Sequence, residues 1–472
     1  MKQQGEKKVD NLIGHATYIK TNPEKSNRYK RSGVPYGLEL LNEAHIYVNE
    51  FKEIENGRIS VPISAIRKIE IYDKDSGATL ASWVFAGIGI AAVTTAVLIV
   101  IILLTKSSCP FVYTSDGKDF TFTGEIFSGA TQPGIERDDY LNLPFIKESE
   151  GKYLIKISNE VKEIQSVNLA ELIIADHPEN TDILIDKYGM IHSIHDLTSP
   201  VEARNSMGKN VISLVSRKDS LSFLFDDKES GKSGVENVVL KFAKPANTHI
   251  AKLLIRAKNS FWLDGLFLKF HSLFGKNFDE FARRQETAPG DKLREWSLNQ
   301  KLPLSVYVEE NGKWHFVDYF NIAGPMAFRE DILPIYLDKV SGDTVKIKLE
   351  CGFNFWELYY AGLDCSKDVS IKTETVPMLT AIDEKGQDVK SLLSKADSLY
   401  YIQPDVGNQV LLTFQSPKRT DSSRTVLLHT RGYYKILRDM GGNADKRSLR
   451  KFKKPGRMPE YSRELYDLLP KK

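Results

Sequence analysis

The sequence is poor in cysteine and nearly balanced in charge. Its 472 residues include three cysteines, Cys109, Cys351 and Cys365, too few for a disulfide framework. The formal net charge is +3, from 65 basic and 62 acidic residues, which is too small to indicate nucleic acid as a partner. The first 30 residues are polar and contain no apolar stretch typical of a cleavable export signal. Either the chain is not exported by that route, or its natural start lies elsewhere.

Motifs that carry catalytic or cofactor chemistry are also lacking. There is no G-x-S-x-G elbow, no P-loop, no H-E-x-x-H and no C-x-x-C. Residues 87–92 (GIGIAA) match the spacing of a dinucleotide-binding loop, but the chain continues as an apolar run rather than as a strand–turn–helix unit. We therefore expect no cofactor, and the motifs assign no catalytic residues.

The longest uncharged apolar run covers residues 81–105. Its central part, residues 83–104, would span about 33 Å as a helix at roughly 1.5 Å per residue, close to the ~30 Å hydrocarbon core of a bilayer. Trp83 and Lys106 flank it as interfacial residues do. This predicts a single transmembrane helix over 81–105, with the lipid bilayer as a partner. The alternative is a buried helix of a large soluble domain.

A cysteine–proline pair stands just beyond this run. Cys109 and Pro110 most simply end the helix and begin a buried strand, while lipidation of Cys109 is the sharper alternative. Basic residues number three in the twenty positions before the run and two in the twenty after it, which weakly favours an N-terminus on the inner side.

The rest of the chain is mainly β by pattern. Residues 1–80 predict a small β domain, similar to small β-barrel modules, because Ile59, Val61 and Ile63 alternate with polar residues beside an Asn-Gly turn. Residues 106–149 predict an aromatic hairpin module with its turn at Asp116-Gly117. A chain of this length also exceeds what one core usually holds, so several domains are expected.

An internal repeat is the most specific feature of the sequence. Five blocks recur in the same order, each with strand-like alternation. The block pairs are YLIKIS (153–158) and VKIKLE (345–350), AELIIA (170–175) and WELYYA (356–361), KDSLSF (218–223) and ADSLYY (396–401), VVLKFAKP (238–245) and VLLTFQSP (410–417), and KLLIRAK (252–258) and TVLLHTR (425–431). They predict two related antiparallel β-sandwich units, over 150–262 and 344–438.

Two segments outside these units differ in character. Residues 263–343 predict an amphipathic helix followed by a hairpin, because phenylalanines recur at helical spacing. The stripe consists of Phe267, Phe270, Phe274, Phe278 and Phe281. It either covers a sheet or lies on a membrane, and Gly275 within it predicts a kink. Residues 439–472 form a basic tail, read as a solvated, partly disordered segment or as a binder of anionic surfaces.

The stretch after the apolar run resembles a known family. Its signature is Ser-Cys-Pro-Phe-x-Tyr, then Asp-Gly, Gly-Glu, Gly-Ala and Glu-Arg-x-Asp-Tyr, which match residues 108–113, 116–117, 124–125, 129–130 and 136–140 here. On these residues the chain resembles uncharacterised bacterial envelope-associated β-rich proteins, over most of residues 107–438. The resemblance implies a place in the cell envelope, but no activity and no catalytic residues. Many members carry an N-terminal export or lipoprotein signal, which this sequence lacks.

Candidate ligand-binding and redox residues remain few. Glu136, Asp138 and Asp139 offer oxygen ligands for a hard cation such as Ca²⁺, although a salt-bridged or turn-forming cluster with Arg137 is the simpler explanation. Further candidates are a metal site from His177, His192 and His195, a disulfide between Cys351 and Cys365, and ligand platforms formed by Trp262, Trp314, Trp356 and Tyr359.

Three functions are consistent with these patterns. The first is a membrane-anchored, non-catalytic binding or scaffold protein of the bacterial cell envelope, with a protein or glycan ligand. The second is a hydrolase of envelope polymers, with a carboxylate pair drawn from Glu125, Glu136, Asp138 and Asp139. The third is a cytosol-facing membrane tether for a soluble partner.

Overall fold

The computed structural model describes residues 110–468, apart from 219, 220, 228, 230, 370 and 422, together with five strands between residues 11 and 73. The expected transmembrane helix over 81–105 and Cys109 both lie outside the described residues. Within the described part of the chain, every helix is too short or too polar to cross a bilayer. The chain divides into two compact units, residues 1–105 with 469–472, and residues 106–468.

The first unit contains antiparallel strands. They are β1 (Asn11–His15), β2 (Asn42–Val48), β3 (Lys52–Ile54), β4 (Arg58–Pro62) and β5 (Ile66–Asp73). One sheet has the order β1-β4-β3, and β2 pairs with β5. The expected strands on either side of the Asn-Gly turn are present, since β3 and β4 pair antiparallel.

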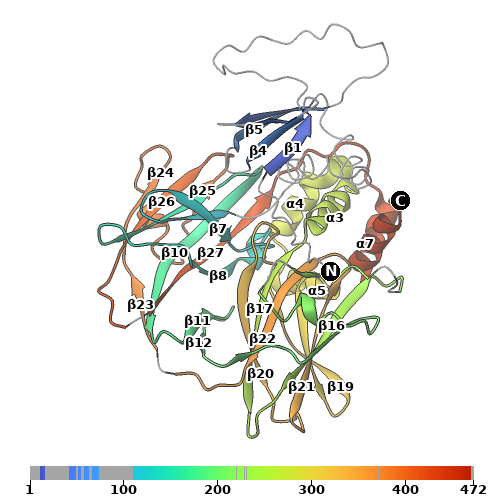
Figure 1. Cartoon of the computed structure of the whole chain (residues 1–472). Helices are drawn as coiled ribbons and strands as arrows, with labels where there is room; N and C mark the ends of the chain where they lie inside the picture. The colour runs from blue at the N-terminus through green and yellow to red at the C-terminus, as the bar shows by residue number, and fades with distance from the viewer. Residues whose placement is uncertain are drawn as a thin grey trace. The chain divides into compact units, whose positions relative to one another are not determined.

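The second unit is built mainly from antiparallel sheets, as the alternating patterns predict (Figure 1). One pair of sheets, here called sandwich 1, has the strand orders β24-β26-β9-β6-β7 and β23-β10-β27-β8, with β25 also paired to β10. Its strands are β6 (Phe111–Ser115), β7 (Phe120–Glu125), β8 (Arg137–Asn142), β9 (Lys152–Ser158), β10 (Glu163–His177), β23 (Lys372–Val376), β24 (Met378–Asp383), β25 (Tyr401–Gln403), β26 (Gln409–Gln415) and β27 (Ser423–Ile436). Ile155 and Leu412 from one sheet meet Leu172 and Leu428 from the other in a shared core.

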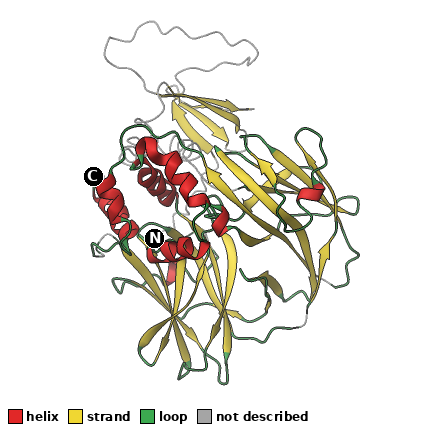
Figure 2. Cartoon of the chain, turned by 180° about the vertical axis from the view of Figure 1, so that it is seen from behind, coloured by secondary structure: helices red, strands yellow, loops and turns green. Residues whose placement is uncertain are grey.

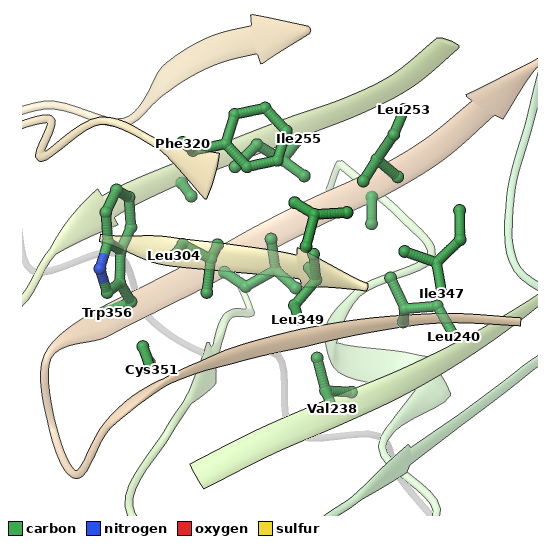
Figure 3. Close-up of a cluster of buried hydrophobic side chains, with 14 of the residues drawn as sticks. Val238, Leu240, Leu253, Ile255, Leu304, Phe320, Ile347, Leu349, Cys351 and Trp356 are labelled. Atoms are coloured by element: carbon green, nitrogen blue, oxygen red, sulfur yellow. The ribbon is translucent and has the colours of Figure 1, made fainter. Parts of the chain in front are cut away.

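A second pair of sheets is here called sandwich 2. In the sequence, its strands come between the two segments that form sandwich 1. Its strand orders are β14-β16-β21-β18-β19 and β13-β22-β17-β20, with β15 also paired to β22. Its strands are β13 (Leu197–Thr198), β14 (Glu202–Asn205), β15 (Phe223–Leu224), β16 (Val235–Ala243), β17 (Ile250–Asn259), β18 (Leu304–Glu310), β19 (Lys313–Phe320), β20 (Arg329–Tyr336), β21 (Thr344–Gly352) and β22 (Trp356–Asp364). Figure 3 shows Val238, Leu240, Ile347 and Leu349 gathered with Ile255 in its core.

Four of the five block pairs form equivalent strands, but they assemble differently from the expectation. Blocks in 150–262 form β9, β10, β16 and β17, and their counterparts in 344–438 form β21, β22, β26 and β27. Strand β9 pairs with β26 and β10 with β27, whereas β16 pairs with β21 and β17 with β22. Each sandwich therefore combines half of one repeat with the opposite half of the other. Sequence similarity identifies equivalent strands, but it does not say which strands pair.

Matching hydrogen bonds show that sandwich 1 and sandwich 2 are equivalent in detail. The Val211 N–H donates to the Ala203 carbonyl at 2.9 Å, and the Val389 N–H donates to the Ala381 carbonyl at 2.8 Å. Both bonds fold a short loop after equivalent strands, β14 and β24, and lead into the 3-10 helices η4 (Ile212–Leu214) and η6 (Lys390–Leu392). The sandwiches are therefore two copies of one architecture, the second inserted into the first.

Helices gather on one side of these sheets (Figure 2). They are α3 (Phe261–Ser272), the 3-10 turn η5 (Gly275–Asn277), α4 (Phe278–Glu286), α5 (Gly290–Asn299), α6 (Lys446–Lys451) and α7 (Arg457–Asp467). The phenylalanine stripe is thus split between α3 and α4, because Gly275 adopts a φ of +50°. Leu266 and Phe270 of α3 belong to the core of sandwich 2.

The expectation of a solvated, partly disordered tail is wrong for residues 439–468. This segment forms α6 and α7, and its apolar side chains Phe452 and Met458 are buried in the core of sandwich 2. Burying these two side chains stabilises the helices against the sheet. The basic residues lie between such anchors, which a count of charges alone does not show.

Candidate ligand cavity

A cavity of about 720 Å³ opens between the helices and the edge of sandwich 1. It is lined by residues of α3, α4, α5 and α6, by the loop 129–135 and by the last residues of β27. This volume lies within the ~300–1,000 Å³ typical of small-molecule sites. A second cavity, beside β10 and β23, has a volume of only about 20 Å³.

Aromatic rings make a large part of the apolar lining. The rings of Phe274 and Phe281 stack with centroids 3.9 Å apart, and Phe270 lies 4.7 Å from Phe452 and 6.1 Å from Trp296. The break at Gly275 lets the stripe turn a corner, so that α3 and α4 present their phenylalanines to one space. A wall of this kind favours an apolar ligand, because contact removes apolar surface of both partners from water.

His271 is the one histidine among the described residues that line the cavity. It is 8% exposed, and its Nδ1 atom has no hydrogen-bond partner among the described residues. Burial, together with the positive charge of Arg438, lowers the pKa of His271 well below its usual value. The ring is therefore neutral at pH 7, and it adds no charge to the interior of the cavity.

Cations line the cavity without carboxylate partners. Lys292 lies on α5, Lys446 and Arg450 lie one turn apart on α6, and Lys453 follows in the next turn. All four are exposed, and none forms an ion pair with a carboxylate in the part of the chain that the structure describes.

The lining acids are already engaged with other basic groups. Glu286 pairs with Lys435 at 2.9 Å, both being lining residues. Burial lowers the pKa of Arg438 to about 10, and the charge of Asp264 opposes this shift. The charge of Asp264 therefore interacts with the charge of Arg438. Because the four lining cations have no such acidic partner in the described part of the chain, the cavity carries a net positive charge.

The acidic signature residues do not form one set of metal ligands. Asp138 accepts hydrogen bonds from His429 at 3.0 Å and Arg431 at 2.8 Å, and Glu136 lies on the same side at 3.4 Å from Arg431. Asp139 points to the other side of β8, because neighbouring residues of a strand face opposite ways. Among the described residues no group of acids, histidines and cysteines is arranged to hold a metal ion.

Asp139 instead joins the two sandwiches. Arg329 of β20 approaches its carboxylate at 2.9 Å, and the Phe127 N–H also donates to it. Burial is the largest influence on Asp139 and would raise its pKa, but the charges of Arg329 and Arg137 outweigh it and lower the pKa. Arg329 and Asp331 repeat the spacing of Arg137 and Asp139 on equivalent strands. This repeated R-x-D motif is a sequence signal from which the contact between the two sandwiches could have been predicted.

The proposed hydrolase carboxylates are not lining residues of the cavity. Glu125 is buried and accepts a hydrogen bond from the Met326 N–H at 2.8 Å. With Glu136, Asp138 and Asp139 held as described above, all four carboxylates are engaged by basic side chains or backbone amides. None of the four lines the cavity.

The three candidate histidines do not form a metal-binding group within the described residues. His177 contacts Thr425 at 2.9 Å on sandwich 1. His192 contacts Asp186 at 3.0 Å within the separate hairpin of β11 (Asp182–Ile185) and β12 (Ile191–Ile194). His195 contacts Thr181 at 3.3 Å. These contacts fasten the hairpin and strand β10.

The candidate disulfide does not form, since Cys351 and Cys365 are both free. Cys351 lies in β21, and Cys365 follows the far end of β22, whose nine residues span about 30 Å at ~3.3 Å each. Because the Cα atoms of a disulfide lie within about 7 Å, this fold cannot join the two residues.

The candidate aromatic platforms have separate positions. Trp356 is fully buried, and its Nε1 donates to the Leu302 carbonyl at 2.9 Å. Trp262 donates to the Ser462 hydroxyl at 2.7 Å. Trp314 is 36% exposed, and Tyr359 is covered in part by Arg256 at 5.2 Å. None of the four lines the cavity.

Comparisons with known proteins give only distant likeness. No family model and no curated protein matches the chain. Among solved structures, an α-xylosidase of family GH31 from Xanthomonas citri aligns over 71% of this chain and 25% of its own length, with 11% identity and a TM-score of 0.16. The chain thus spans about a quarter of that enzyme. A chain from the structure of Sulfolobus turreted icosahedral virus aligns over 70% of this chain and 100% of its own length, with 9% identity and a TM-score of 0.14. These TM-scores are too low to support an inference about fold or function.

Proposed function

We propose that this chain is a non-catalytic binding protein of the bacterial cell envelope, held at the membrane by residues 81–105, which takes an apolar ligand into the cavity. The observation that carries the proposal is the aromatic wall around about 720 Å³ of space. The resemblance to envelope-associated proteins and the apolar run support the location.

The chemistry of the lining favours an apolar chain over a glycan. Glycans need many hydrogen-bonding groups, whereas the lining includes the apolar rings of Phe270, Phe274, Phe278 and Trp296. The neutral ring of His271 is compatible with an apolar ligand, because it introduces no buried charge.

Filling the cavity tests this proposal. Ala282 lines the cavity from α4, so Ala282→Trp puts an indole into the ligand space. The next residue, Arg283, is exposed and does not line the cavity, so Arg283→Trp is the matched control. The assay is native mass spectrometry of the full chain, purified in mild detergent and titrated with hexadecanol and hexadecanoate.

We expect bound amphiphile on the unmodified chain and on Arg283→Trp, and at least about tenfold weaker binding to Ala282→Trp. Absence of bound amphiphile on the unmodified chain, or equal binding to both variants, would contradict the proposal.

A further inference from the structure

We propose that the cavity selects amphiphiles with an anionic headgroup, a carboxylate or a phosphate, which Lys446 and Arg450 recognise. This rests on the proposed function and names the ligand class of the same site. The headgroup would lie at α6, and the hydrocarbon chain would lie among the phenylalanines.

The charges on α6 are the first argument. Lys446 and Arg450 are one helical turn apart, at a spacing where like charges repel each other and destabilise a helix. Lys446 also lies in the first turn, where the helix dipole disfavours a cation. Lys292 and Lys453 line the same cavity, and none of these four cations, here called the positive cluster, has a carboxylate partner in the described part of the chain. An anion at this position would relieve the repulsion.

The position of the cluster relative to the aromatic wall is the second argument. Leu449 and Phe452 come from the same short segment as Lys446 and Arg450, and they too line the cavity. One segment thus presents apolar and cationic groups to the same space. An amphiphile is the ligand class that satisfies both, because its anion reaches the cations while its chain stays in the apolar part.

Other occupants match the cavity less well. A neutral lipid or an apolar peptide would leave the cations unmatched, and a free anion would leave the phenylalanines exposed to water. The cluster does not distinguish a carboxylate from a phosphate, since lysine and arginine bind both. The test therefore includes both headgroups.

The experiment compares two double variants of α6 with equal changes in net charge. Lys446→Gln/Arg450→Gln removes two lining cations, and Arg447→Gln/Lys451→Gln removes two exposed cations of the same helix that do not line the cavity. The ligands are hexadecanoate, hexadecyl phosphate and hexadecanol, together with acetate and inorganic phosphate alone. Binding to the full chain is titrated by native mass spectrometry.

We expect the unmodified chain to bind both anionic amphiphiles about tenfold more tightly than hexadecanol, a size typical of two exposed charge contacts. The lining variant should lose this preference and keep its affinity for hexadecanol, while the control variant should change less than about twofold. Thermal unfolding of both variants checks their fold.

Raising the salt concentration of the unmodified protein tests the same claim without a variant. Screening should weaken the binding of hexadecanoate from 50 to 500 mM NaCl and leave hexadecanol bound as before.

Each contrary outcome has a distinct meaning. Equal affinity for hexadecanol and hexadecanoate, or equal losses in both double variants, would overturn the selection of anions while leaving the cavity as a binding site. Binding of acetate or phosphate alone as tightly as the amphiphiles would overturn the role of the hydrocarbon chain. Failure of every amphiphile to bind would overturn the proposed function itself.

Discussion

Replacing Arg329 with methionine should strongly destabilise the contact between the two sandwiches. The guanidinium contacts Asp139 at 2.9 Å and donates to the Tyr140 carbonyl at 3.0 Å, and both members of the ion pair are at most 10% exposed. Arg329→Met keeps the aliphatic stem but leaves the Asp139 carboxylate buried with its nearest cation removed. Arg137 remains, but its closest approach to Asp139 is 3.9 Å.

The size of this loss follows from the burial of the pair. Removing one partner of a buried ion pair costs about 3–5 kcal/mol, because the other charge stays desolvated. Asp139→Asn in the same chain removes that charge. The double variant Asp139→Asn/Arg329→Met should therefore lose about 2 kcal/mol less than the sum of the two single changes. Arg204→Met is the matched control: Arg204 pairs with Glu202 on the surface, where water screens the pair and its loss has little effect on stability.

Urea unfolding followed by tryptophan fluorescence measures these losses. Because Arg329 connects β20 to β8, the variant should also unfold in two separated steps where the parent unfolds more cooperatively. A loss below about 1 kcal/mol, or equal losses in Arg329→Met and Arg204→Met, would refute the assignment of Asp139 and Arg329 as the buried joint.

Three further predictions concern other parts of the second unit. Burial would lower the pKa of His429, but hydrogen bonds and charges from Asp138 and Glu171 raise it to about 9. The stabilising contribution of His429 is therefore complete below about pH 6.5 and is lost as the pH rises through about 9; His429→Gln should cost about 1–3 kcal/mol at pH 6 and almost nothing at pH 10 in urea titrations, and a pH-independent difference would contradict this. Gly275→Ala should destabilise by about 1–3 kcal/mol, since φ is +50° and the new Cβ would lie 2.6 Å from the Gly442 carbonyl oxygen; a rise in the melting temperature, as for most helical Gly→Ala changes, would show that the helix continues through this position. Cys365 should react with a thiol reagent in the native protein before Cys351 does, because burial raises the pKa of the Cys351 thiol well above its usual value; mass spectrometry that finds the two joined would contradict the strand order.

Alternation and turn residues identified many strands of the second unit directly. The pattern of β21 is one apolar residue in every two, and these residues face the core of sandwich 2. The hairpin of β18 and β19 turns at Asn311-Gly312, where both residues have positive φ. These features are local, so the sequence carries them within a few residues.

Pairing between the repeats could not be predicted in the same way. Strands β9 and β21 are similar in sequence, and the backbone N–H and C=O groups of each could form ladder hydrogen bonds with either β26 or β16. The choice depends on contacts between segments that lie far apart in the chain. The exchange of halves therefore becomes visible only in the sheet order.

Only some features of the cavity could be predicted from the sequence. The phenylalanine stripe predicted an apolar helical face, and the basic tail suggested an anionic partner. That the two would lie together depends on Phe452, which buries the start of the tail against Phe270. The carboxylates of the acidic cluster do not converge on one point for a simpler reason. Asp138 and Asp139 are neighbours on a strand and therefore face opposite ways.

Mapping the site of a photoreactive ligand tests the central claim most directly. Hexadecanoate with a diazirine at the end of its chain would be bound to the full-length protein, irradiated, and its attachment sites found by peptide mass spectrometry. We predict labels on the aromatic wall, at residues 267–296, with labelling suppressed by Ala282→Trp and by excess hexadecanoate. Labels scattered over the sheets, or unaffected by either, would contradict the assignment of this cavity as the binding site.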